Sequence, residues 1–163
     1  KLIICRLNGG AAGAGCSLAL ASDFIVASEN ASLIEVFINV GLVMDSGSSF
    51  FLPRLVGSAR AFELSTMGNK VSAKQALEWG MINRCVSPEN LDTETQSIAD
   101  YYASAPTKAI GLMKKLLNKS FNSDLESMLE YEAYCQETAG SSSDNKEGVA
   151  AFNEKRKPNF TGK

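Results

Sequence analysis

Residues 8–16 read Asn8-Gly9-Gly10-Ala11-Ala12-Gly13-Ala14-Gly15-Cys16, an almost unbroken run of glycine and alanine. The apolar residues 2–7 before it have the character of a buried strand, and residues 17–22 after it that of a helix. Residues this small let a neighbouring element or a ligand approach the backbone closely. The unpaired N–H groups of a helix start also favour an anion or a developing oxyanion. Close strand–helix packing and an anion site are therefore both open interpretations.

The best-known glycine fingerprints do not fit this run. A P-loop requires Gly-Lys-Ser/Thr, where Gly15-Cys16-Ser17 stands here. A dinucleotide-binding fingerprint that starts at Gly13 meets Leu18 in place of its third glycine. Ser17 does not lie in a nucleophile elbow either. None of these three fingerprints is therefore predicted here, and an oxyanion or phosphate site stays open beside close packing.

The composition narrows the possible chemistry further. The chain has 163 residues, of which 45% are hydrophobic and 21% charged, typical of about one globular domain. It contains no histidine, which excludes Ser-His-Asp and Cys-His nucleophile pairs and histidine-based metal sites, so no metal is expected. Acid–base chemistry must use Asp, Glu, Lys, Tyr or Cys. The net charge of −2 argues against binding to nucleic acid.

The cysteines and the apolar runs indicate the compartment. The four cysteines, Cys5, Cys16, Cys85 and Cys135, form no C-x-x-C pair, which is typical of reduced thiols in a cytoplasmic protein. No stretch approaches the roughly 18 apolar residues that a membrane span needs, so no membrane association is expected. The apolar start of the chain lacks a signal-peptide pattern and is interpreted as a strand. Because the sequence begins inside this strand, we expect it to be the C-terminal portion of a longer protein.

From residue 58 onward the pattern becomes helical. Ser72 and Gln75 form a capping box for a short helix that Gly80 ends, and residues 81–86 alternate as a strand. Residues 140–143, Gly-Ser-Ser-Ser, are interpreted as a flexible hinge. Four further helices are predicted: 89–103, one from Pro106, one from a box at 123–126 to Gly140, and one from a box at 144–147.

An acidic turn follows the first third of the chain. Asp45 lies among the apolar residues 42–44, just before a predicted helix at 46–52. One interpretation is that Asp45 caps this helix. The other is that its apolar neighbours desolvate the carboxylate, which then serves as a general base and acid. Glu35, ten residues earlier, is interpreted as a solvated or ion-paired strand residue.

Taken in order, these segments resemble the crotonase family, also called the enoyl-CoA hydratase/isomerase family. The resemblance covers nearly the whole chain. It implies an α/β fold in which residues 1–87 are the C-terminal part of a crotonase-like ββα spiral. Residues 88–163 would form a helical oligomerisation region, in which the family's trimers assemble. The segments that carry the resemblance are Leu7–Gly15, Ser22–Phe24, Ala27–Ala31, Gly41–Val43, Gly47, Leu52–Gly57, Ser72–Gly80 and Phe152–Arg156.

The resemblance also implies a site. Family members bind acyl-CoA thioesters and hold the thioester oxygen of an enolate with two backbone N–H groups. One donor would be the N–H of Ala14, and the other would come from a loop upstream of residue 1. The basic residues 155–157 would either contact CoA phosphates or form a solvated tail. The expected substrate-binding residues are Ala12, Gly13, Ser17, Phe37, Phe152 and Lys155.

Two departures from the family pattern sharpen the expected reaction. Hydratases of the family carry glutamates where Ser17 and Phe37 stand here, so water addition is disfavoured. Asp45 matches the position where the isomerases carry a single acid. The turn Met44-Asp45-Ser46-Gly47 resembles the Pro-Asp-Ser-Gly turn of phenylacetate-pathway ring-epoxide isomerases.

The expected function is therefore that of an acyl-CoA isomerase with Asp45 as proton shuttle. Alternatives within the family are an enoyl-CoA hydratase or a dehalogenase in which the same Asp attacks an aryl ring. An alternative of another class is a non-catalytic acyl-CoA binder or an RNA-binding relative. No cofactor is expected besides the coenzyme A of the substrate. The expected assembly is a homotrimer or a dimer of trimers.

Overall fold

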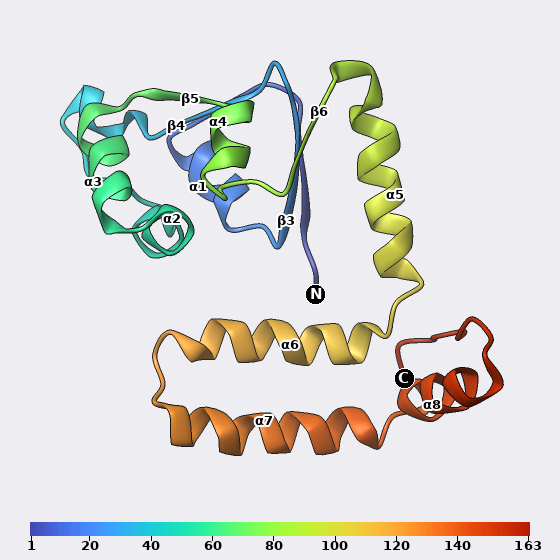
Figure 1. The fold of residues 1–163 in the computed structure, drawn as a ribbon. Coiled ribbons are helices and arrows are strands. Elements are labelled where there is room, and N and C mark those ends of the chain that lie inside the picture. Colours follow the sequence, from blue (N-terminus) through green and yellow to red (C-terminus); the bar gives the residue numbers. More distant parts are fainter. The chain divides into compact units, whose positions relative to one another are not determined.

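Two three-stranded sheets organise residues 3–97 in the computed structural model, which describes residues 1–163 (Figure 1). One sheet has the strand order β1-β3-β6 and the other the order β2-β4-β5. The strands are β1 (Ile4–Leu7), β2 (Gly10–Ala12), β3 (Phe24–Ser28), β4 (Ser32–Ile34), β5 (Lys70–Ser72) and β6 (Arg84–Val86).

The two sheets arise because a ββα repeat occurs twice along the chain. The first repeat consists of β1, β2 and α1 (Ala14–Leu20). The second repeat consists of β3, β4, the 3-10 helix η1 (Val36–Val40) and α2 (Ser48–Val56). β1 pairs with β3 and β2 pairs with β4, both in parallel. Each strand of the first repeat therefore lies beside the corresponding strand of the second repeat. β6 continues the first sheet in parallel, and β5 closes the second in antiparallel.

Residues 3–97 form the first compact unit of the chain, and apolar side chains from both sheets and from four helices make up its single core. Besides α1 and α2, the helices are α3 (Ser58–Met67) and α4 (Ala73–Glu78). Leu33 of β4, Leu52 of α2 and Ala76 of α4 are among its most buried members. Burial of this apolar surface is the main force that stabilises the unit.

The second unit consists of residues 1–2 and 98–163 and is built almost entirely of helices. It begins within α5 (Leu91–Ala103), which the short 3-10 helix η2 (Pro88–Asn90) precedes in the first unit. It continues with α6 (Thr107–Ser120), α7 (Leu125–Gly140) and α8 (Ser143–Glu154). α6 and α7 pack side by side (Figure 1). No helix of the chain is both long enough and apolar enough to cross a membrane.

Most of the predicted elements are present, with shifted ends. Helix α1 begins three residues earlier than expected, at Ala14, and α2 begins at Ser48 instead of residue 46. The capping box of Ser72 and Gln75 is confirmed, with both of its hydrogen bonds formed.

Three details of the helical region were predicted wrongly. The cap of α7 is Asp124, whose carboxylate accepts from the Ser127 N–H, and the cap of α8 is Ser142. Residues 140–143 are not a separate hinge, since they comprise the last residue of α7, a two-residue connection and the first residue of α8. The Ser142 hydroxyl accepts a hydrogen bond from the Asn145 N–H at the start of α8. This serine is therefore a helix cap and not part of a flexible linker.

Candidate functional site

The turn from β2 into α1 depends on Gly13. Gly13 has φ 54° and ψ −127°, a conformation that side chains other than hydrogen strongly disfavour. Its N–H donates to the Ile34 carbonyl at 3.0 Å, and its own carbonyl accepts from the Ser17 N–H at 3.0 Å. The next residue, Ala14, is exposed and is the first of α1, so its N–H has no acceptor within the helix. The turn thus fixes an available N–H donor at an exposed position, with exposed Ala12 before it.

Phe37 lies against this turn. A Cβ atom placed on Gly13 would lie 3.5 Å from Val36 Cγ2 and 3.7 Å from Phe37 Cζ. The ring of Phe37 is half-buried. The structure therefore brings together Gly13, Ala14 and Phe37, three of the residues that the sequence predicts for the site.

Ser17 takes a different position from the one expected of a substrate contact. It is fully buried on α1, and its hydroxyl donates to the Gly13 carbonyl at 3.3 Å. Ser17 thus supports the turn from inside. Its role in substrate binding stays a prediction.

Asp45 is not the cap of α2. The left-handed residues Ser46 (φ 51°) and Gly47 (φ 88°) separate it from the helix, whose N-cap is Gly47 without a side-chain hydrogen bond. Asp45 contributes only its backbone carbonyl, which accepts from the Ser48 N–H at 3.0 Å. Its carboxylate forms no hydrogen bond or ion pair within the chain, so the capping interpretation is wrong and the group has no structural partner.

The expected desolvation of Asp45 is also wrong for this chain. Asp45 is exposed, as are Leu42 and Val43, and Val43 is 84% exposed. Of the apolar residues before Asp45, Leu42 and Val43 face water and only Met44 is half-buried, so they do not withdraw the carboxylate from water.

Glu35 corrects a further expectation, because it is neither solvated nor ion-paired. Its side chain is only 3% exposed, and its Oε1 accepts from the Ser48 hydroxyl at 2.7 Å. Cys16 of α1 lies beside it, and burial together with the Glu35 carboxylate raises the pKa of the Cys16 thiol. The sequence carries no signal that separates Glu35 from Asp45, since apolar residues flank both carboxylates.

The predicted residues of the C-terminal region belong to the second unit. Phe152 on α8 is 85% exposed, and Lys155, also exposed, ends that helix in a left-handed conformation. Arg156 is not a free tail cation, because its guanidinium donates to Glu147 and to Glu154 at 2.6 Å each. Arg156 is therefore not a simply solvated tail residue, and contact of residues 155–157 with CoA phosphates stays a prediction.

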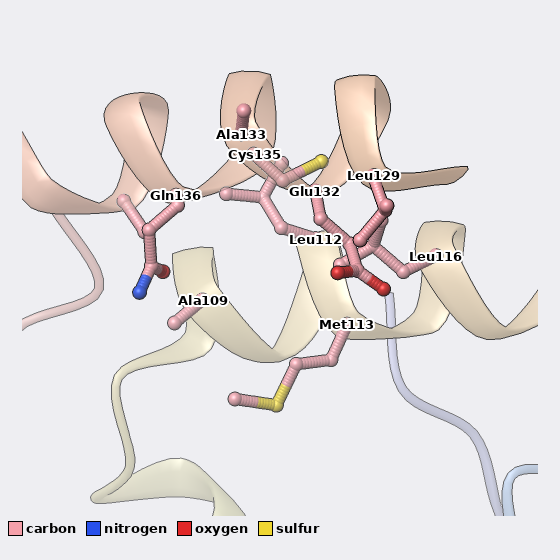
Figure 2. Close-up of a pocket in the computed structure, with 10 residues that line it drawn as sticks. Ala109, Leu112, Met113, Leu116, Leu129, Glu132, Ala133, Cys135 and Gln136 are labelled. Atoms are coloured by element: carbon pink, nitrogen blue, oxygen red, sulfur yellow. The ribbon is translucent and has the colours of Figure 1, made fainter. Parts of the chain in front are cut away.

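The second unit also carries a groove between α6 and α7. It has a volume of about 420 Å³, and Leu112 and Leu116 from α6 and Leu129 from α7 are among its mostly apolar lining residues (Figure 2). Leu129 is more than half exposed, as is Met113 on the same groove. The groove is thus an apolar surface that the chain itself leaves uncovered.

Comparisons with known proteins agree with this architecture. The sequence model described as enoyl-CoA hydratase/isomerase matches residues 1–163. The chain is 44% identical to a 1,2-epoxyphenylacetyl-CoA isomerase of Escherichia coli, over 100% of this chain and 62% of that protein. It is 37% identical to a probable enoyl-CoA hydratase of Rhodobacter capsulatus, over 99% of this chain and 63% of that protein. The chain thus spans about 62% of the length of the curated relatives that it matches.

A solved structure shows the same fold. The crystal structure of an enoyl-CoA hydratase subunit from Geobacillus kaustophilus superposes with a TM-score of 0.95 at 40% identity, over 99% of this chain and 63% of that one. The expected crotonase-like α/β fold is confirmed by this match. The chain belongs to the enoyl-CoA hydratase/isomerase family, the crotonase family.

Proposed function

We propose that the full protein is an acyl-CoA isomerase, which shifts a double bond or rearranges an epoxide in an enoyl-CoA-type thioester. In the double-bond shift, the Asp45 carboxylate removes a proton from one carbon of the acyl chain and returns it to another. The electron pair left by the proton moves into the thioester carbonyl to give an enolate. One positioned carboxylate suffices for such a transfer, so the reaction needs no further acid or base from this chain.

The observation that carries this proposal is the unpartnered carboxylate of Asp45. A carboxylate that capped a helix or paired with a cation would be held by those contacts. The turn at residues 45–48 is instead held by backbone geometry and by Ser48, which leaves the carboxylate available to a substrate. The 44% identity to a 1,2-epoxyphenylacetyl-CoA isomerase supports the isomerase over other activities of the family.

The Ala14 N–H is proposed to donate to the enolate oxygen. As the first residue of α1 it lies at the positive end of the helix, where negative charge is stabilised. Removing one such donor typically slows a reaction by about 10²–10³-fold. Ala12, Gly13, Ser17 and Phe37 would line the acyl-binding part of the site.

Hydration of an enoyl-CoA is the less favoured reaction. Ser17 is buried with its hydroxyl on the Gly13 carbonyl, and Phe37 offers a ring where a carboxylate would be needed. Neither residue can activate a water molecule as a carboxylate does.

The CoA portion and the assembly are part of the same proposal. Phe152 and Lys155 would contact the CoA moiety, which serves as part of the substrate in place of any separate cofactor. The exposed apolar groove between α6 and α7 supports assembly into a homotrimer or a dimer of trimers. With its four free cysteines, the protein is proposed to work in the cytoplasm.

The test is the Asp45→Asn variant of the full protein, assayed with 3-enoyl-CoA and with epoxyphenylacetyl-CoA. We expect turnover to fall by about 10²–10⁴-fold, since the amide cannot accept the proton. Glu78→Gln is the matched control, because Glu78 is an exposed carboxylate on α4, and it should keep full activity. Near-wild-type turnover of Asp45→Asn would overturn the proposal. A covalent ester trapped on Asp45 would also overturn it, in favour of nucleophilic attack.

A further inference from the structure

Glu35 is a buried acid for which the proposed reaction has no use. It directly follows β4 and occupies the N-cap position of η1, yet its side chain caps nothing there. No lysine or arginine forms an ion pair with it, and its Oε2 is buried without a hydrogen-bond partner. Burying a carboxyl group with one oxygen unpaired costs stability, and an apolar side chain of similar size would cost less. A purely structural role therefore explains this residue poorly.

A hydrogen bond that Glu35 accepts leads to the turn that carries Asp45. Its Oε1 accepts from the Ser48 hydroxyl at 2.7 Å, and the N–H of the same serine donates to the Asp45 carbonyl at 3.0 Å. Ser48 is itself fully buried, so water does not compete for either bond. Two hydrogen bonds of ordinary length through Ser48 thus join the Glu35 carboxyl to the backbone of Asp45.

The same carboxyl group also lies beside the helix that begins with Ala14. Cys16, in the first turn of α1, lies beside it, and α1 begins with Ala14. Phe37 follows it by two residues on η1. Glu35 therefore stands where the elements carrying Ala14, Phe37 and Asp45 meet.

From this juxtaposition we infer that Glu35 is a positioning residue, which through Ser48 holds the Asp45 turn in place relative to α1. The inference rests on the proposed function. The turn needs such a tie because it is exposed, contains the left-handed residues Ser46 and Gly47, and has no side-chain cap. A displacement of about 1 Å at a reacting group can cost about 100-fold in rate.

The experiment compares four variants of the full protein: Glu35→Met, Ser48→Ala, the double variant and Glu35→Gln. Glu35→Met and Ser48→Ala should each lower kcat by about 10- to 100-fold, with KM changed less than about threefold. The double variant should be no slower than either single one, because both break the same link. Glu35→Gln keeps an acceptor for the Ser48 hydroxyl and should restore most of kcat.

The unfolding midpoint of the variants distinguishes a positioning role of Glu35 from a purely structural role. The double variant leaves no buried hydroxyl unpaired, so its unfolding midpoint should equal or exceed that of the wild type while kcat stays low. A fall in kcat that only parallels a fall in stability would overturn the inference. Unchanged kcat in Glu35→Met, or a Glu35→Gln variant as slow as Glu35→Met, would overturn it as well.

Hydrogen exchange at the Ser48 amide keeps this inference distinct from the proposed function. Glu35→Met should speed exchange of this amide, which donates to Asp45, by about tenfold or more. If Asp45→Asn remains active, the proposed function fails, yet faster exchange would still support Glu35 as the anchor of the turn. Unchanged exchange would overturn the anchor even where Asp45→Asn is inactive.

Discussion

Gly13 sets the direction of the backbone that presents the Ala14 N–H, and its conformation (φ 54°, ψ −127°) suits glycine alone. We expect Gly13→Ala to lower the free energy of unfolding by about 1–3 kcal/mol, from backbone strain, since the added Cβ would meet only ordinary contacts. Gly15→Ala is the matched control, because Gly15 is helical and a Cβ there meets nothing within 4 Å. Urea denaturation measures both, and equal stability of the two variants would contradict the prediction.

At the scale of single residues, the sequence predicted local backbone conformation better than it predicted the burial of side chains. The small residues at 9–15 indicated a tight turn into a helix, because glycine and alanine have a local conformational meaning. The exposure of Asp45 and the burial of Glu35 could not be predicted in the same way. Both carboxylates have apolar neighbours in sequence, and only the packing of α1 and α2 around Glu35 distinguishes them.

Among the helices, α6 carries a glycine that nothing in the structure requires. Gly111 lies inside α6, and a Cβ placed on it meets no atom within 4 Å. We expect Gly111→Ala to stabilise the protein by about 0.5–1 kcal/mol, because alanine loses less backbone entropy on folding. Thermal unfolding measures the effect. Gly68→Ala should do the opposite, since Gly68 ends α3 at φ 61° and a Cβ there would lie 3.0 Å from Asn39 Oδ1.

The elements were predictable where their ends carry chemical signals. α4 was located by its capping box, and α6 by Pro106, which occupies its N-cap position. The strands β2 and β5 were not predicted, because each has three residues and neither shows an alternating apolar pattern. The 3-10 helix η1 was not predicted either, because it has only five residues and no side-chain cap at Glu35.

In the helical unit as a whole, charged contacts hold the end of the chain against α8. Glu147 accepts from Arg156 and from the Asn159 N–H, and these contacts lower the pKa of Glu147 to about 2 from its usual 4.5. A carboxyl with a lowered pKa in the folded state stabilises that state above its unfolded pKa. This stabilisation should be complete above about pH 5 and disappear as the pH falls towards 2.

The prediction is that acid loosens the C-terminal segment. The Asn159 amide should exchange faster as the pH drops from 5 to 2, beyond the intrinsic pH dependence of exchange. Glu147→Gln should remove this extra dependence, while Glu126→Gln, an exposed carboxylate in the first turn of α7, should keep it. An unaltered pH profile in Glu147→Gln would contradict the assignment.

At the scale of the whole molecule, the apolar groove between α6 and α7 is a candidate contact surface between copies of the protein. Met113 is 58% and Leu129 56% exposed on it, a degree of apolar exposure that marks contact surfaces. If copies of the full protein meet there, Met113→Glu and Leu129→Glu should each place an unpaired charge in the interface and yield monomers in sedimentation velocity. Lys115→Glu adds the same side chain to α6 away from the groove lining and should leave the assembly intact. Assemblies that survive both groove substitutions would show that the subunits meet elsewhere.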